Sequence, residues 1–295
     1  MITSAGREAV GVLGGWSAWL PLRGAGRGRQ VPAEPGLYRI RGEGVQEVAY
    51  IGETGRHLRG RLGQLQGVYA AQMPYADPHT AAPALWAMRD REGCDFEASV
   101  LPVAADAQIR KGLEALAVSL YRVEAGESPA AKFGGMPAGY RKSSGNNARL
   151  VAAGLRVRGG ADPRSVGTVA SAPVHGPLGS KPDGDSWMNW RWTPWLLVQD
   201  AAPPLGGVGL YRLRQADSAD LVYVGQGSIG QRIRSHLAKA AIDGHRQARW
   251  FSGALEVSWV ELPATAKTNL LEHENDLTAS HIYAVDRPPS AQYLG

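Results

Sequence analysis

The sequence has a single cysteine, Cys94, among its 295 residues. One cysteine excludes an internal disulfide and a zinc site built from cysteines, and it is typical of a reducing compartment. The sequence also lacks any apolar run near the ~18 residues that a transmembrane helix needs, and its N-terminus lacks the charged-then-apolar pattern of a signal peptide. We therefore expect a cytoplasmic protein without a membrane partner.

Charge of one sign is not abundant either, because 32 Lys and Arg residues against 27 Asp and Glu residues leave a net charge of +5. This balance permits a polyanionic partner without requiring one. The positions of the arginines are more informative, since they recur in short clusters. The clusters lie at residues 23–29, 56–61, 141–142 and 232–234. We expect them to face phosphate groups.

The sequence does contain a repeat. Residues 36–41 read GLYRIR and residues 209–214 read GLYRLR, and each is followed by a second tyrosine motif, YIG at 50–52 or YVG at 223–225. The two tyrosines of each copy are 12 residues apart, and the copies are offset by 173 residues at both motifs. Two motif pairs at one spacing and one offset indicate an internal duplication.

The repeat continues on both sides of the tyrosines. Matching segments are 16–20 with 192–196, 96–102 with 255–259, and 129–133 with 289–293. Each copy is therefore expected to contain a Trp segment, two strands, a helix, a third strand, a second helix and a closing loop. Four tryptophans near the second copy are expected to pack in the core and between domains rather than to stack on bases. These are Trp187, Trp190, Trp192 and Trp195.

The chain length suits two domains, each large enough for its own hydrophobic core. We place the first domain at residues 1–157 and the second at 185–295. Residues 158–184 are rich in Gly, Pro, Ser and Ala, which is typical of a linker.

The secondary structure can be predicted in outline from turn residues and apolar periodicity. The first two strands are expected at 36–41 and 47–51, with counterparts at 209–214 and 221–225. A helix should follow Gly52 or Gly225, because apolar residues recur there at helical spacing. The third strands are expected at 95–101 and 254–261, and the helices with the glutamate at 113–121 and 270–282.

As a set, the features of each copy resemble those of the GIY-YIG nuclease superfamily. They are a GLY strand, a YIG strand, an arginine on the next helix, a glutamate on a later helix and a polar residue after a proline. The set covers most of each repeat and is far more specific than either tripeptide alone. The resemblance implies an α/β (α+β) fold of two tandem domains, each a small antiparallel three-stranded sheet flanked by helices. It also implies cleavage of DNA phosphodiesters with one divalent metal.

The second copy carries a nearly complete set of the residues that the resemblance implies to be catalytic. They are Tyr211, Tyr223, Arg232, His236, Glu274 and Gln292. The tyrosine pair would activate the water, the arginine would steady the charge that develops on the phosphate, and the histidine follows the arginine by one turn. Glu274 would be the metal ligand, because it precedes Pro289 by 15 residues, as Glu114 precedes Pro129. The glutamine stands where many members have asparagine.

The first copy departs further from the pattern. Glu114 would be its metal ligand, and Arg61 is the better match to the helix arginine, although Arg59 keeps the ungapped register. The histidine position falls on Leu65, and Lys132 replaces the closing asparagine. These changes favour DNA contact over catalysis. The expected DNA-binding residues are Tyr38, Tyr50, Arg59, Arg61, Lys132, Arg141, Lys142 and Arg234.

Two functions compete. In the first, the protein binds double-stranded DNA in restriction or defence, is catalytically degenerate and selects modified DNA that contains methylated cytosine. In the second, it is a DNA endonuclease that depends on Mg²⁺ or Mn²⁺, with the second copy as the catalytic unit. Phosphodiester cleavage needs an activated water, charge stabilisation and a Lewis acid, and a tyrosine network, an arginine and a carboxylate-bound ion can provide them.

Overall fold

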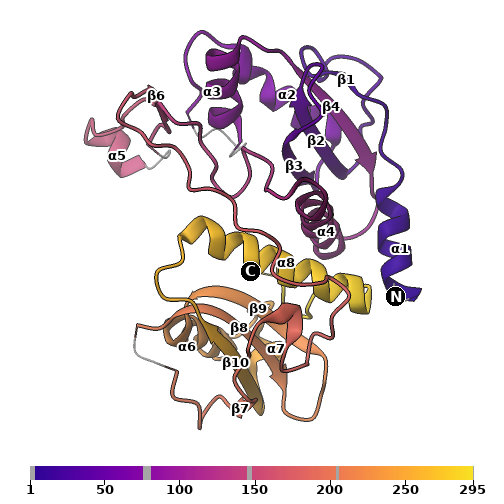
Figure 1. Ribbon diagram of the computed structural model, residues 1–295, viewed down its shortest axis with the longest axis vertical. Coiled ribbons are helices and arrows are strands. Elements are labelled where there is room, and N and C mark those ends of the chain that lie inside the picture. Colours follow the sequence, from indigo (N-terminus) through magenta and orange to yellow (C-terminus); the bar gives the residue numbers. More distant parts are fainter. Residues whose placement is uncertain (1–3, 76–80, 145–147, 204–205, 295) are drawn as a thin grey trace. The chain divides into compact units, whose positions relative to one another are not determined.

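The computed structural model describes residues 4–75, 81–144, 148–203 and 206–294 (Figure 1). Contacts divide the chain into two compact units. Unit 1 consists of residues 1–14, 107–126 and 171–295, and unit 2 consists of residues 15–106 and 127–170. The units therefore do not follow the order of the two sequence copies, because residues 107–126 of the first copy fold with the second copy.

Unit 2 holds one antiparallel sheet with the strand order β1-β4-β2-β3. Its strands are β1 (Leu20–Pro21), β2 (Gly36–Gly42), β3 (Val48–Thr54) and β4 (Phe96–Pro102). Its helical segments are α2 (Leu58–Gln64), the 3-10 helix η1 (Leu65–Tyr69) and α3 (Ala82–Glu92). Beyond the repeat, β5 (Tyr140–Arg141) pairs with β6 (Gly160–Ala161), and α5 (Ala148–Ala152) lies between them in sequence.

Unit 1 holds a second antiparallel sheet with the corresponding order β7-β10-β8-β9. Its strands are β7 (Leu196–Leu197), β8 (Val208–Gln215), β9 (Leu221–Ser228) and β10 (Leu255–Glu261). Its helical segments are α1 (Ser4–Leu13), α4 (Ala107–Ala125), the 3-10 helix η2 (Trp187–Asn189), α6 (Ile229–Ala240), α7 (Ala248–Phe251) and α8 (Lys267–Val285). The fold is thus α+β with antiparallel sheets, as expected.

The two sheets agree in register as well as in order. Tyr38 lies opposite Gly52 and Tyr211 lies opposite Gly225, and both hairpins shift register two to three residues after the tyrosine. Each of these two sheets has four strands, one more than the three expected from the sequence. The additional strand in each sheet is a two-residue edge strand, β1 or β7, which pairs with β4 or β10. Such a strand is too short to show alternation in the sequence, and it covers part of an otherwise open sheet edge.

The arginine after each first tyrosine packs beneath tryptophans. The Arg212 guanidinium lies 4.4 Å from the centre of the Trp192 ring and 4.5 Å from that of the Trp195 ring. In the first copy, the Arg39 guanidinium lies at similar distances, 4.8 and 4.7 Å, from the rings of Trp16 and Trp19. Arg212 is fully buried and donates to the carbonyls of residues 182 and 184. Burial lowers its pKa to about 9. The tryptophans therefore serve packing within each unit, on the sheet face opposite the tyrosines.

A buried polar network holds α4 on α8 within unit 1. Arg122 Nε donates to Asp276 Oδ1 at 3.0 Å, and Arg122 Nη1 lies 3.1 Å from Glu272 Oε1. Ser119 Oγ donates to Asp276 Oδ1 at 2.7 Å. Burial raises the pKa of Asp276 although Arg122 opposes the shift. Because breaking such a pair leaves a buried charge uncompensated, the network specifies how α4 packs in this unit.

Residues 158–184, expected to form a linker, make defined contacts in both units. In unit 2, Gly160 pairs with Arg141 through β6. In unit 1, Ala172 N donates to Glu272 Oε2, and Leu178 O accepts from Ser280 Oγ.

None of the helices in the described ranges combines the length and the apolar character that crossing a membrane requires.

Candidate functional site

The β8–β9 hairpin places the two tyrosines of the second copy on one face of the sheet. Tyr223 lies opposite Leu213, two residues after Tyr211, so the tyrosines are diagonal neighbours. Their ring centroids are 6.1 Å apart, with the planes inclined by 22°. Gly225 lies beneath Tyr211, and a Cβ there would be 2.4 Å from the tyrosine oxygen. The glycine of the YVG motif is therefore required by the close approach of the tyrosine side chain.

Helix α6 brings an arginine and a histidine to the Tyr211 hydroxyl. Ile229 and Ile233 are buried in the core, which turns Arg232 and His236 toward the tyrosines. Arg232 Nε donates to Tyr211 Oη at 3.3 Å, and His236 Nε2 lies 2.8 Å from the same oxygen. The hydroxyl is thus held from both sides, while Arg232 as a residue stays exposed.

Burial keeps the groups around this hydroxyl uncharged, apart from the arginine. His236 is only 1% exposed, and burial, with help from Lys239 and Arg232, lowers its pKa to about 3. Burial also raises the pKa of Tyr211 and of Tyr223. At neutral pH the imidazole is therefore neutral and both tyrosines are phenols. Within the described residues, His236 Nδ1 is buried without a hydrogen-bond partner, which costs stability.

Glu274, on α8, supplies the carboxylate of this site. The residue is partly exposed, yet burial raises the pKa of its carboxyl to about 7, against the attraction of Arg232. The charge of Glu274 in turn contributes to the raised pKa of Tyr223. Helix α8 contacts β8 and β9 within unit 1, and the charges of Arg232 and Glu274 both act on Tyr223, so the three side chains lie in one region built from α6, β9 and α8.

A third tyrosine, Tyr293, lies in the same region and is not among the site residues predicted from the sequence. Burial raises its pKa first, and the charges of Glu114 and Glu274 raise it further. Its backbone φ is 64°, in the left-handed region that few side chains adopt. The signal was present, because Tyr293 aligns with Phe133 at the ends of the two repeats and Phe133 has a φ of 49°.

Gln292 holds the closing loop rather than presenting its amide to a substrate. It is 4% exposed, and its Oε1 accepts from the backbone N of Val224 at 3.2 Å. Gln108 of α4, a second residue missed from sequence, donates from Nε2 to Gln292 O at 2.9 Å and to the carbonyls of Pro289 and Ser290. Helix α4 thereby helps to position the loop that carries Tyr293.

In unit 2 the first copy repeats the tyrosine arrangement. The ring centroids of Tyr38 and Tyr50 are 6.0 Å apart, and Arg61 Nε donates to Tyr38 Oη at 3.3 Å. Arg59 instead donates to the carbonyl of Val31 at 2.9 Å. Arg61, and not Arg59, is therefore the counterpart of the arginine in the second copy. Leu65, which is fully buried, occupies the histidine position.

The other groups of the first copy differ from those of the second. Lys132 Nζ donates to Ile51 O at 3.1 Å and lies 5.2 Å from the Tyr50 ring, so a cation stands at the tyrosine pair. Glu114 lies on α4 in unit 1, where its charge acts on Tyr293. A polar cavity of about 370 Å³ opens beside Arg61, lined also by Arg56, His57 and Glu53, among other residues.

The three remaining predicted DNA-binding residues lie on the β5–β6 pair and on α6. Arg141 and Lys142 are exposed at the β5–β6 pair of unit 2, where Arg141 Nε lies 3.8 Å from Asp162 and Lys142 Nζ donates to Gly134 O. Arg234 is exposed on α6 of unit 1.

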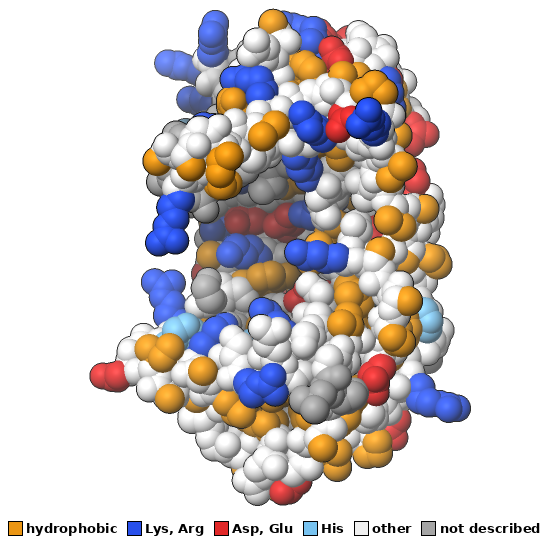
Figure 2. Space-filling model, turned by 90° about the vertical axis from the view of Figure 1, so that its left-hand side faces the viewer, with side chains coloured by type: hydrophobic (Ala, Val, Ile, Leu, Met, Phe, Trp, Pro, Cys, Tyr) orange, Lys and Arg blue, Asp and Glu red, His pale blue; other side chains and the backbone are white. Residues whose placement is uncertain are grey.

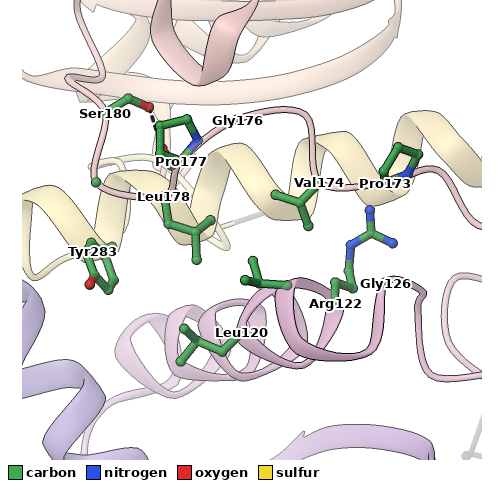
Figure 3. Close-up of a pocket in the computed structure, with 12 residues that line it drawn as sticks. Leu120, Arg122, Gly126, Pro173, Val174, Gly176, Pro177, Leu178, Ser180 and Tyr283 are labelled. Atoms are coloured by element: carbon green, nitrogen blue, oxygen red, sulfur yellow. Dashed lines mark hydrogen bonds between the residues drawn. The ribbon is translucent and has the colours of Figure 1, made fainter.

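A mostly apolar cavity of about 830 Å³ lies elsewhere in unit 1, between α4, α8 and residues 173–180 (Figure 3). Its charged lining residue, Arg122, already bonds Asp276, Glu272 and Ala172 O. None of the predicted site residues lines it, so we assign it no part in the chemistry of the tyrosine site.

The carboxylate content of the site limits the kind of metal centre that it can form. Within the described ranges, no cluster of three or more His, Cys, Asp or Glu side chains could hold a metal ion. One carboxylate beside phenol oxygens is a hard, oxygen-only donor set, which suits an ion that keeps most of its waters.

Comparisons of the chain with protein-family models, with curated proteins and with solved structures gave no match.

Proposed function

We propose that the chain is a GIY-YIG-type protein of restriction or defence that binds double-stranded DNA and cleaves it at the unit 1 site with Mg²⁺ or Mn²⁺. The observation that carries this proposal is the Tyr211 hydroxyl, which Arg232 and His236 hold at 3.3 and 2.8 Å beside the Glu274 carboxyl. The tyrosine–arginine bond also occurs in unit 2, so the histidine and the carboxyl are what distinguish the unit 1 site.

Each side chain has a role that its environment supports. Tyr211 is fully buried and keeps its proton at neutral pH, so it would position Arg232 through their hydrogen bond. Tyr223 is partly exposed and is also a phenol at neutral pH, so it would orient the attacking water by a hydrogen bond, and the proton of that water would pass to solvent. His236 is neutral and buried, so it would hold the Tyr211 hydroxyl in place rather than store a proton. Arg232, exposed at the site, can donate a charged hydrogen bond to a phosphate oxygen.

The donor set fits a magnesium ion held mainly by its ligands from water and phosphate. Glu274 would hold it, and Tyr223 and Tyr293 would shape the site around the carboxyl. When bound, the ion would stabilise charge on the leaving oxygen as a Lewis acid. A single carboxylate predicts weak binding without DNA and tighter binding once a phosphate contributes ligands.

A second candidate, binding of modified DNA without cleavage, is favoured by the first copy. Leu65 stands where the second copy has His236, and Lys132 adds a cation where that copy has a neutral amide, while the Arg61–Tyr38 bond that could meet a phosphate persists. Unit 2 would then anchor the DNA, with selectivity for methylated cytosine read outside the tyrosine site.

Plasmid nicking separates the two candidates. Supercoiled DNA, with and without methylated cytosine, would be incubated with the protein and Mg²⁺ or Mn²⁺. Conversion to the open circle that is lost in Glu274→Gln but kept in Glu124→Gln, an exposed glutamate on α4, supports cleavage. Binding without conversion on either substrate would leave only the second candidate, and absence of both binding and nicking would refute the proposal.

A further inference from the structure

Two antiparallel segments of unit 2, residues 136–144 and 157–168, form what we call the basic ribbon. The β5–β6 pair is its centre, with Tyr140 opposite Ala161 and Arg141 opposite Gly160. The pairing continues at one end, where Ser144 N donates to Val157 O at 2.9 Å. It also continues at the other end, where Thr168 N donates to Met136 O at 3.0 Å. The ribbon lies outside the part of the sequence that the two copies share.

The basic ribbon is anchored to α3 by its own small apolar cluster. Tyr140 is 9% exposed, packs edge-on to Trp86 with ring centroids 6.2 Å apart, and donates to Asp90 Oδ2 at 2.8 Å. Arg158 donates to Met73 O at 3.1 Å. Because the ribbon is already ordered, docking it onto a partner costs little conformational entropy.

The charge of this region is strongly one-sided. Residues 136–170 hold six Lys and Arg residues against one Asp, which is a net charge of +5, equal to that of the whole chain. Arg141, Arg158 and Arg164 of the ribbon are exposed. Lys142 is exposed as a residue, although partial burial of its ammonium, which donates to Gly134 O, lowers its pKa. The Arg141–Asp162 pair, at 3.8 Å and with the arginine side chain 57% exposed, neutralises little. Figure 2 shows the side of the molecule on which α5 and β6 lie in Figure 1, with many exposed Lys and Arg side chains.

Exposed aliphatic side chains accompany these cations. Leu155 is 63% exposed, Val157 48%, Val166 90% and Val169 58%. The large apolar side chains exposed in this segment are therefore aliphatic rather than aromatic. A surface that binds membranes usually combines basic residues with Trp or Phe on one face of a helix, and the ribbon has neither feature.

We propose that the basic ribbon docks in the major groove of double-stranded DNA. The major groove, about 12 Å wide, admits a two-stranded β-ribbon. The exposed arginines and lysine would contact phosphates on the groove walls, while Val157 and Val166 would meet base edges, where pyrimidine C5 methyl groups lie. The inference rests on the proposed function, since it takes DNA as the partner, and it adds where that DNA is held.

A charge-matched pair of variants tests the phosphate contacts. The ribbon variant is Arg141→Gln, Lys142→Gln and Arg164→Gln. It spares Arg156 and Arg158, whose guanidinium groups lie 3.4 and 4.2 Å from the centre of the Tyr75 ring. The control variant is Arg191→Gln, Arg246→Gln and Lys267→Gln, which removes three exposed charges from unit 1. Binding of a short duplex by the full-length chain would be measured by fluorescence anisotropy over a salt series.

The ribbon variant should bind about 100-fold more weakly than wild type at low salt, with the slope of log affinity against log salt reduced by about 3. The control variant should change both values by much less. If wild type binds the duplex and the two variants bind alike, the ribbon assignment is overturned and the proposed function stands. If wild type does not bind duplex at all, the proposed function fails with it.

A second variant, Val157→Ser with Val166→Ser, keeps every charge and tests the groove. It should weaken duplex binding by about 3- to 10-fold with an unchanged salt slope, because base-edge contacts release no counterions. An affinity equal to wild type would overturn docking in the groove. Tighter binding of wild type to anionic lipid vesicles than to duplex at equal salt would overturn DNA as the partner.

Discussion

The two tyrosine clusters share one geometry and differ in the groups around it. In both, the ring centroids lie about 6 Å apart, and the arginine donates to the first tyrosine at 3.3 Å. One turn after the arginine, however, unit 1 has His236 and unit 2 has Leu65. The hairpin register, the glycine beneath the ring and the tyrosine–arginine bond are therefore common to both units, whereas the side chains around that bond differ.

The closing loops of the two copies also share an architecture and differ in one side chain. Gln292 accepts from Val224 N in unit 1, and Lys132 donates to Ile51 O at the equivalent strand position in unit 2. Both residues tie their loop to the strand that carries the second tyrosine. The lysine adds a positive charge where unit 1 has a neutral amide and the Glu274 carboxyl nearby. The first copy thus keeps the tie between loop and strand and differs from the second in the charge at this position.

The largest expected difference between the copies concerns cleavage. Arg232→Ala or Glu274→Gln should reduce plasmid nicking about 100-fold or more, because each removes charge stabilisation that the transition state requires. Arg61→Ala should leave the nicking rate nearly unchanged and weaken DNA binding instead. Equal loss of nicking in both arginine variants would show that unit 2 also takes part in cleavage.

The pH dependence of nicking should follow the carboxyl of Glu274. The pKa of this carboxyl is about 7, so the carboxyl is mostly protonated at pH 6. The nicking rate should therefore fall about tenfold per pH unit at pH values below the pKa, and it should level off at pH values above the pKa. His236, with a pKa of about 3, stays neutral throughout this range. A rate that is flat between pH 5 and 8, measured under subsaturating metal, would contradict the assignment of Glu274.

The same shift predicts a change in stability. The pKa of the Glu274 carboxyl is 4.5 in the unfolded chain and about 7 in the folded protein. As pH rises between these values, the unfolded chain loses its proton first, so the free energy of unfolding falls. The loss is at most about 3 kcal/mol. Glu274→Gln should therefore flatten the decline in the free energy of unfolding over this range, as denaturant titrations at several pH values would show. An unaltered decline would place the titrating group elsewhere.

Giving the unit 1 cluster the leucine that unit 2 has one turn after its arginine should have a smaller effect, and it should lower both stability and nicking. His236→Leu removes an unpartnered ring nitrogen, but it also leaves the fully buried Tyr211 hydroxyl without its 2.8 Å partner, so it should destabilise unit 1 by about 1 kcal/mol while lowering nicking. Thermal unfolding and plasmid nicking on the same preparation measure both changes. A stabilised variant would indicate that the cost of the unpartnered nitrogen outweighs the Tyr211–His236 bond.

Local patterns in the sequence were sufficient to predict much of the fold. The expected strands correspond to β2, β3, β4, β8, β9 and β10, and the expected glutamate helices lie within α4 and α8. Alternation and helical spacing are local signals, so they survive without knowledge of packing. Helix α3 was missed because its first six residues, Ala82 to Ala87, are buried on every side and show no polar face.

The sequence by itself also determined the tyrosines, Arg61, Arg232 and Glu274 as site candidates, since a repeated spacing marks them without reference to contacts. Only the tertiary structure decided that Glu114 folds with unit 1, that Gln108 and Tyr293 join the unit 1 site, and that residues 136–168 form a ribbon. These outcomes depend on contacts between distant segments, such as Arg122 with Asp276, and on burial, which sets the protonation of His236 and Glu274. Neither long-range packing nor desolvation leaves a periodic signal in a single sequence.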